Sequence, residues 1–450
     1  MDLIKKLKVK DILNILFYLG IYGFGTFCAT NVLIFGNNPL KEQPLFLFLI
    51  LFFLTIAFFI TLVIFNAKTS KYIPSKTLLI SSLILLSIGL FTLLVIPTTI
   101  KTNIFLENNN YKDIYYQISN KQRINYSLRL IVVFILFFTT IDILPKTFKN
   151  IDIIFLASIF VIIAVFVFCI LSYVLDAKDY VKLFHSIINK DEYCFISIDS
   201  VFPNKNSYGI ILFIGMCASL YCHNKNKRFY WLIIDVFFLI NFAFTFCKTG
   251  FICALIITFA YYILELICSI KNNLKKYTLS LIIIGGTIIL LCIALFAYLC
   301  INNKLQNIFA FITSGHGFGS LLSRFGIQYS CINLVLNTNA LFGLGYQVSN
   351  DILFLMYGTE FAHNGMLELL GHGGVILFSY GILLIVYLFS NIIKDMKIDK
   401  RNSIFMLILL SISLLYTSFE SGNIVMPQTL EYVYLSILIF VPIMRQYPLK

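Results

Sequence analysis

Residues 45–66 read LFLFLILFFLTIAFFITLVIFN, an apolar run without a charged side chain. A helix needs about 20 such residues to cross the hydrocarbon core of a bilayer. The run has no alternation of polar and apolar positions, which disfavours a strand of an outer-membrane barrel. Because backbone N–H and C=O groups find no water inside lipid, we predict a membrane-spanning helix here.

The same pattern recurs along the whole chain of 450 residues, of which 59% are hydrophobic and 12% charged. A soluble domain carries roughly 25% charged residues. We therefore predict one all-α polytopic membrane domain over residues 1–450 with about twelve spans. The first span is expected to be retained, since it is longer than the apolar core of a signal peptide. The predicted spans cover residues 13–35, 45–66, 77–97, 129–145, 151–174, 207–222, 229–246, 250–270, 278–300, 366–390, 403–419 and 428–444.

The distribution of basic residues predicts the orientation of the chain. An even number of spans puts both termini on one side, and the short connections on that side hold most of the 34 lysines and arginines. Short basic loops stay in the cytoplasm, so both termini are predicted to be cytoplasmic. The net charge of +13 is explained in this way, and no nucleic-acid partner is expected. The 11 cysteines show no metal-ligand spacing, so we expect neither a metal site nor a disulfide framework.

Three long connections then face outward, at residues 98–128, 175–206 and 301–365. Loops of this length are usually functional or disordered. The third is the largest and lacks the compositional bias of a disordered linker. It is expected to form short helices that pack on the membrane domain. His185 and His316 lie in these loops and are interpreted as incidental.

Two basic patterns lie where the predicted outer connections meet helices. Lys205 and Asn206 precede an apolar run, where Asn206 or Ser207 is expected to cap a helix whose free N–H groups attract anions. Residues 245–250 read TFCKTG and break another apolar stretch. Lys248 in this turn is a candidate functional cation at the edge of the membrane. The alternative is an ordinary lysine that extends to the lipid headgroups.

Arg324 begins a third pattern, an amphipathic segment that is followed by Gly343-Leu344-Gly345. A guanidinium presents a fork of donors that suits phosphate oxygens. The two glycines permit a close turn of the backbone. We predict that Arg324 starts an interfacial helix and binds an anionic group, with an ordinary exposed arginine as the alternative.

The fourth pattern is His363-Asn364 with Glu368 one turn further on, where the large outer loop enters a span. An imidazole has a pKa near neutrality and is suited to proton transfer. Glu368 lies at i+4 from Asn364, on the same helix face. An isolated histidine is more often a satisfied loop residue, so the interpretation depends on the neighbouring patterns.

The order of the four patterns resembles the O-antigen ligase-like family, which includes the Wzy polymerases of capsule and O-antigen and the ligases that attach O-antigen to lipid A core. The resemblance covers residues from about 200 to 390 and the surrounding multi-span layout. This chain has Cys247-Lys248 where many members have Ser-Arg. The matching pieces are Pro203-Asn204-Lys205-Asn206, Cys247-Lys248-Thr249-Gly250, Arg324, Gly343-Leu344-Gly345, and His363-Asn364 with Glu368 and Gly374.

The resemblance implies a metal-independent, inverting glycosyltransferase that polymerises polyprenyl-diphosphate-linked oligosaccharide repeat units on the outer leaflet of a bacterial plasma membrane. No cofactor is implied. Expected partners are membrane lipid and the chain-length regulator and flippase of the same pathway. The implied catalytic residues are His363, Glu368 and Arg324, and the implied diphosphate- or glycan-binding residues are Lys248, Arg324, Asn206, Lys205, Asn364, Gly343 and Gly345.

Which of His363 and Glu368 is the base stays open at this point, as does the acceptor. A composition rich in Ile, Lys, Asn and Phe favours a polymerase of a Gram-positive system over a lipid A ligase. The rival classes are a lipid-linked oligosaccharide flippase or transporter and a structural or receptor membrane protein. Transporters usually place charged groups and broken helices at the bilayer midplane in repeated halves. In this sequence few ionisable residues lie within the spans, with Asp235 and Glu265 as candidates, and no repeat of halves is visible.

Overall fold

The computed structural model describes residues 8–29, 45–70, 72–106, 110–148, 152–182, 198–202, 205–245, 247–272, 318–358, 362–420 and 422–447. The predicted span at 278–300 lies outside these ranges, as do His185 and His316. The helices are α1 (Val9–Ala29), α2 (Leu45–Ser70), α3 (Lys76–Val95), α4 (Asn120–Phe138), the π-helical turn η2 (Thr139–Ile143), α5 (Leu144–Thr147), α6 (Ile153–Leu175), α8 (Lys205–Asn226), α9 (Tyr230–Thr245), α10 (Lys248–Asn272), α13 (Phe318–Asn339), α14 (Val348–Tyr357), α15 (Gly365–Asp395), α16 (Lys400–Thr417) and α17 (Leu430–Gln446).

In the described part of the chain, 7 helices are long and apolar enough to cross a membrane. They are α1, α2, α3, the continuous helix Asn120–Thr147, α6, α10 and α15. Helices α8, α9, α16 and α17 lie over four more of the predicted spans. The prediction of an α-helical, membrane-embedded protein is therefore confirmed. The number of twelve spans stays a prediction.

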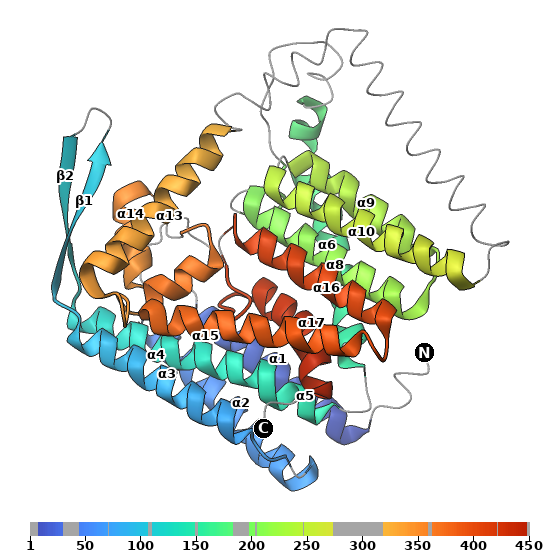
Figure 1. The fold of residues 1–450 in the computed structure, drawn as a ribbon, viewed down its shortest axis with the longest axis horizontal. Helices are drawn as coiled ribbons and strands as arrows, with labels where there is room; N and C mark the ends of the chain where they lie inside the picture. Colours follow the sequence, from blue (N-terminus) through green and yellow to red (C-terminus); the bar gives the residue numbers. More distant parts are fainter. Residues whose placement is uncertain are drawn as a thin grey trace.

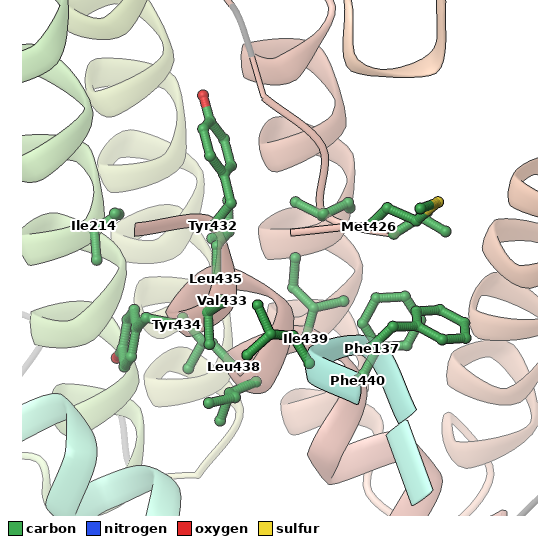
Figure 2. Close-up of a cluster of buried hydrophobic side chains, with 14 of the residues drawn as sticks. Phe137, Ile214, Met426, Tyr432, Val433, Tyr434, Leu435, Leu438, Ile439 and Phe440 are labelled. Carbon is green, nitrogen blue, oxygen red and sulfur yellow. The ribbon is translucent and has the colours of Figure 1, made fainter. Parts of the chain in front are cut away.

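Helix α17 lies at the centre of the bundle and contacts α8, α6, α1, α15 and α16. Figure 2 shows its side chains, including Leu435, Leu438 and Phe440, packed between Ile214 of α8 and Phe137 of α4. A helix that is apolar on all sides belongs in a core. The hydroxyl of its Ser436 donates to the carbonyl of Ile424, so α17 anchors the residues that precede it.

The helix bundle has two distinct ends (Figure 1). The end that bears β1 (Thr99–Leu106), β2 (Asn110–Gln117), α13 and α14 is called the hairpin end. The opposite end, where α1 begins and α17 ends, is called the termini end. Ion pairs lie at this end: the Lys146 ammonium is 2.6 Å from Asp142 within one continuous helix, and Glu265 of α10 accepts from Lys227 and from Arg401 of α16. These basic residues belong to the connections that are predicted to be cytoplasmic.

A β-hairpin occupies the connection 98–128, for which the sequence analysis predicted no strand. β1 and β2 are antiparallel, with Ile100 opposite Tyr116, and both side chains are buried. The Tyr116 hydroxyl donates to Asp351 of α14 at 2.6 Å. A two-stranded sheet has unpaired edges that need water, so the hairpin belongs outside the hydrocarbon. A search for long apolar runs finds membrane helices and misses such a hairpin.

In the connection 301–365, the described residues form two helices, α13 and α14, and α13 packs on α15. α13 begins at Phe318, ahead of the start that was predicted at Arg324. The turn after α13 fits into a kink of α15 at Gly373 and Gly374. Leu344 N–H donates to the carbonyl of Gly371 at 2.9 Å. The turn after α13 and the kinked helix α15 thus hold each other in place.

We expect Gly374→Ala to destabilise the protein by at least about 2 kcal/mol. Gly374 has φ +62°, and a Cβ there would lie 2.3 Å from the carbonyl oxygen of Leu341. A thermal unfolding midpoint in detergent measures the effect. Gly326→Ala on α13 is the matched control, because a Cβ at Gly326 meets no atom within 4 Å. Equal midpoints for the two variants would contradict a close contact at the kink.

Candidate functional site

An ion pair between Arg324 and Glu420 connects α13 to the segment that follows α16. The Arg324 Nη1 donates to Glu420 Oε1 at 2.9 Å and also to the carbonyl of Phe419. The two charged side chains are 16% and 6% exposed, respectively. Burial raises the pKa of Glu420, and the charge of Arg324 opposes this shift. The guanidinium is thus held in one position at the hairpin end of the bundle.

Two lysines at helix starts lie on the same side of the bundle as this carboxylate, and one of them is near it. Glu420 accepts a hydrogen bond from Thr249 and lies within electrostatic range of Lys205. Lys205 begins α8 and Lys248 begins α10, and the two ammonium groups lie within electrostatic range of each other. The start of a helix already carries a partial positive charge, so a lysine there is unfavourable without a nearby anion. Arg324 and Lys205 thus lie around the Glu420 carboxylate, and Lys248 lies next to Lys205.

Close packing of small residues brings these two helix starts together. A Cβ at Gly209 of α8 would lie 2.7 Å from the sulfur of Cys247, just before α10. A Cβ at Gly250 would lie 2.8 Å from the ring of Phe242. Cys247 N–H donates to the hydroxyl of Thr245 at 3.1 Å, which closes the turn between α9 and α10. Glycine at these positions therefore lets the ends of α8, α9 and α10 meet.

His363 lies beside this cation cluster, ahead of α15. Its φ is +50°, a left-handed conformation that costs about 1–3 kcal/mol for a residue with a side chain. Gln328 of α13 donates to the His363 carbonyl at 3.0 Å. Burial, and secondarily the charge of Arg324, lowers the pKa of His363 to about 4. The imidazole is therefore neutral at pH 7.

Asn364 and Glu368 build the start of α15. The Asn364 Oδ1 accepts from the N–H groups of Met366 and Leu367, and its Nδ2 donates to the carbonyl of Ser418 at 3.4 Å. Glu368 is one turn deeper and 4% exposed. Its Oε1 has no hydrogen-bond partner in the described part of the protein. The first turn of α15 is thus bound to residues 418–429, with a carboxyl group buried behind it.

The structure brings most of the sequence-predicted site residues together. Those at one site are Lys205, Lys248, Arg324, His363 and Asn364, with Glu368 buried behind them. Asn206 lies next to Lys205, but α8 begins at Lys205. Asn206 and Ser207 therefore lie in its first turn and not at the N-cap, which corrects that prediction.

The two glycines of the predicted site lie elsewhere. The atoms nearest to a Cβ at Gly343 belong to the backbone of Gly371, Gly373 and Gly374, and those nearest to a Cβ at Gly345 belong to Leu93 of α3. Both glycines have positive φ, at +70° and +93°. Their contacts show a packing role, and no described contact joins them to Arg324.

Sequence reasoning missed Glu420, and it named Thr249 only as part of the turn at residues 245–250 without predicting a role for its side chain. Glu420 lies in the short polar break FESGN, residues 419–423, between two predicted spans. An acidic residue in that break is a signal that a search for basic patterns ignores. Among the described residues, no group of three or more His, Cys, Asp or Glu side chains has an arrangement that fits a metal ion.

No family model matches the chain, and neither does any curated protein or solved structure. The likeness to the O-antigen ligase-like family therefore remains an expectation from the order of the motifs. What the molecule itself offers is a cation cluster and a neutral imidazole at one end of a membrane-embedded bundle.

Proposed function

We propose that the protein is a membrane glycosyltransferase that transfers glycan from a polyprenyl diphosphate to a sugar hydroxyl at the outer face of a bacterial plasma membrane. The observation that carries the proposal is a cation cluster in which Arg324 and Lys205 lie near Glu420 and Lys248 lies near Lys205, with His363 near Arg324. A lipid-linked donor presents its anionic diphosphate in the headgroup plane, where helix ends lie. Because the hairpin end is opposite the basic termini end, it is the end that faces outward in this proposal.

In the proposed reaction, an acceptor hydroxyl attacks the anomeric carbon of the donor. The bond from that carbon to the diphosphate oxygen breaks, and the electron pair stays on the oxygen. Arg324, Lys205 and Lys248 stabilise the charge that grows there, as oriented cations do for other leaving groups. The proton of the hydroxyl moves to a base of the protein. Attack opposite the leaving diphosphate inverts the anomeric configuration.

His363 is the preferred base of the two sequence candidates. Its side chain is only partly buried and lies within electrostatic range of Arg324, so it is close to the leaving group. Its neutral state leaves a ring nitrogen able to accept a proton. Glu368 is almost fully buried, so an acceptor reaches it only after α15 moves. Glu368 is kept as the second candidate.

The pH dependence of transfer is expected to reflect His363. Its pKa is lowered to about 4, so the base form persists as the pH falls and is lost only below about 5. We expect a constant rate between pH 6 and 8 and a decline in more acidic buffer. Arg324→Gln removes one cause of the low pKa and is expected to move this decline to higher pH. Initial rates from pH 4 to 8 measure both effects, and a wild-type midpoint near 6.5 would contradict the assignment.

Reconstitution in liposomes with a purified lipid-linked repeat unit tests the function. A ladder of longer lipid-linked glycans supports the polymerase. Transfer to a different added acceptor supports the ligase, and passage of intact donor across the bilayer without growth supports the flippase. Arg401→Gln is a suitable control, because it removes a cation at the termini end that pairs with Glu265. The expected chain-length regulator and flippase can be added to the same liposomes as partners.

A further inference from the structure

Arg129 lies on α4 and is completely buried. Its Nε donates to the Asn125 side chain at 2.9 Å. The two terminal nitrogens, Nη1 and Nη2, have no hydrogen-bond partner in the described structure. The ring of Phe48, from α2, lies 5.4 Å from the guanidinium carbon. Arg129 thus presents two buried donor groups for which the described residues supply no acceptor.

Two other arginines near the hairpin end, Arg123 and Arg324, contrast with Arg129 because each has at least one terminal nitrogen with an acceptor. Arg123, on the same helix, donates to the carbonyls of Leu93 and Ile96 at 2.7 Å each. Arg324 donates to Glu420. Burying a guanidinium with two unused nitrogens costs several kcal/mol, so such a group marks a functional site. A pair of adjacent N–H donors fits the two oxygens of one oxyanion.

Arg129 lies close to the ends of two other helices at the hairpin end. Cys28, in the last turn of α1, lies within electrostatic range of Arg129. Tyr346, also within that range, donates its hydroxyl to the carbonyl of Ala29, the last residue of α1. Phe48 is in the first turn of α2. Arg129 therefore lies level with the last described turn of α1 and the first turn of α2, at the hairpin end of the bundle.

Arg129 is also connected to the first site through Tyr346. The Tyr346 ring packs on His372 with the ring centroids 5.0 Å apart, and Tyr346 lies within electrostatic range of both Arg129 and Glu368. Asp351 is the carboxylate that lies within electrostatic range of Arg129 among the described residues. It accepts hydrogen bonds from Tyr116 and Tyr126 instead of from the Arg129 nitrogens. Two cationic sites thus flank one buried polar region at the hairpin end.

We propose that Arg129 is the binding residue of a second oxyanion site and that its ligand is the diphosphate of a second lipid-linked glycan. The inference rests on the proposed function, in which a polymerase joins two lipid-linked chains and so holds two diphosphates at once. Only the bond between the anomeric carbon and the diphosphate of the donor breaks, and in the proposed reaction this diphosphate lies beside Arg324. The acceptor diphosphate stays intact and needs a binding site without catalytic chemistry, which a buried arginine beside an aromatic ring supplies. A ligase with a different acceptor has no need for this site.

Binding of farnesyl diphosphate to the purified protein in detergent tests the inference. We expect two molecules per chain in the wild type, and one tight site in each of Arg129→Gln and Arg324→Gln. The lost site is expected to weaken by about tenfold to a hundredfold. Lys121→Gln, which removes an exposed cation from the same helix, is the control and is expected to keep both sites. Farnesol in place of the diphosphate measures the contribution of the apolar tail.

A second measurement separates binding from folding. Because the two terminal nitrogens of Arg129 have no partner among the described residues, Arg129→Gln is expected to leave the thermal midpoint unchanged or higher. An unchanged stoichiometry in Arg129→Gln would overturn the inference. The inference would also be overturned if the binding of glucuronate depended on Arg129 and the binding of the diphosphate did not. That result would assign the site to an acidic sugar. Two-site binding without glycan transfer would instead refute the proposed function and leave the second oxyanion site standing.

Discussion

Replacing His363 with asparagine is expected to lower the rate of glycan transfer by about 10²–10⁴-fold, the usual contribution of a general base. Asparagine tolerates a left-handed φ, so it suits the backbone of position 363, where φ is +50°. It cannot accept the proton of the acceptor hydroxyl, so the chemical step alone is affected. The measurement is the initial rate of chain extension at saturating donor. Glu368→Gln is the parallel variant, and the larger loss identifies the base.

His363→Gly gives a sharper version of this experiment. Glycine adopts a positive φ without strain, so this variant is expected to be as stable as the wild type or slightly more stable. It leaves a space where the imidazole was, and added imidazole is expected to restore part of the activity. A slow variant that imidazole does not rescue, together with a greater loss in Glu368→Gln, would move the role of base to Glu368.

Arg324→Gln is expected to slow transfer by about tenfold to a hundredfold, because one charge-assisted contact to the leaving diphosphate is worth roughly 1.5–3 kcal/mol. It is also expected to destabilise the protein by about 3–5 kcal/mol, since the Glu420 carboxylate is left buried without its partner. Both quantities are measurable on the same preparation, by initial rate and by thermal unfolding.

The double variant Arg324→Gln/Glu420→Gln separates the two effects. It removes both charges of the ion pair, so stability is expected to return toward the wild-type value. Transfer is expected to stay slow, because the cation that faces the diphosphate is still missing. Arg401→Gln, which breaks the ion pair with Glu265 at the termini end, is expected to change stability without a specific loss of transfer. A double variant that regains its rate along with its stability would show that Arg324 has a structural role only.

Much of the candidate site follows from sequence order, and an important part does not. The sequence predicts site residues where a polar side chain interrupts or borders an apolar run, as it does for Lys205, Lys248, Arg324 and His363. In the folded chain they lie at one end of the bundle, as a membrane requires of charges that border spans. Glu420 was missed because its relevance depends on a contact with Arg324, 96 residues away. Gly343 was included with the site, although its closest contacts are with the backbone of α15.

The amino-acid sequence by itself determined that this is a helical membrane protein. Hydrophobicity over about 20 consecutive residues is a local property, and a bilayer accepts such a run only as a helix. The tertiary structure alone decided which charges are neutralised. Arg123, Arg129 and Arg324 are alike in the sequence, yet one donates to backbone carbonyls, one pairs with a carboxylate, and Arg129 keeps two nitrogens without a described partner. That difference arises from contacts between helices far apart in the chain, which no local pattern encodes.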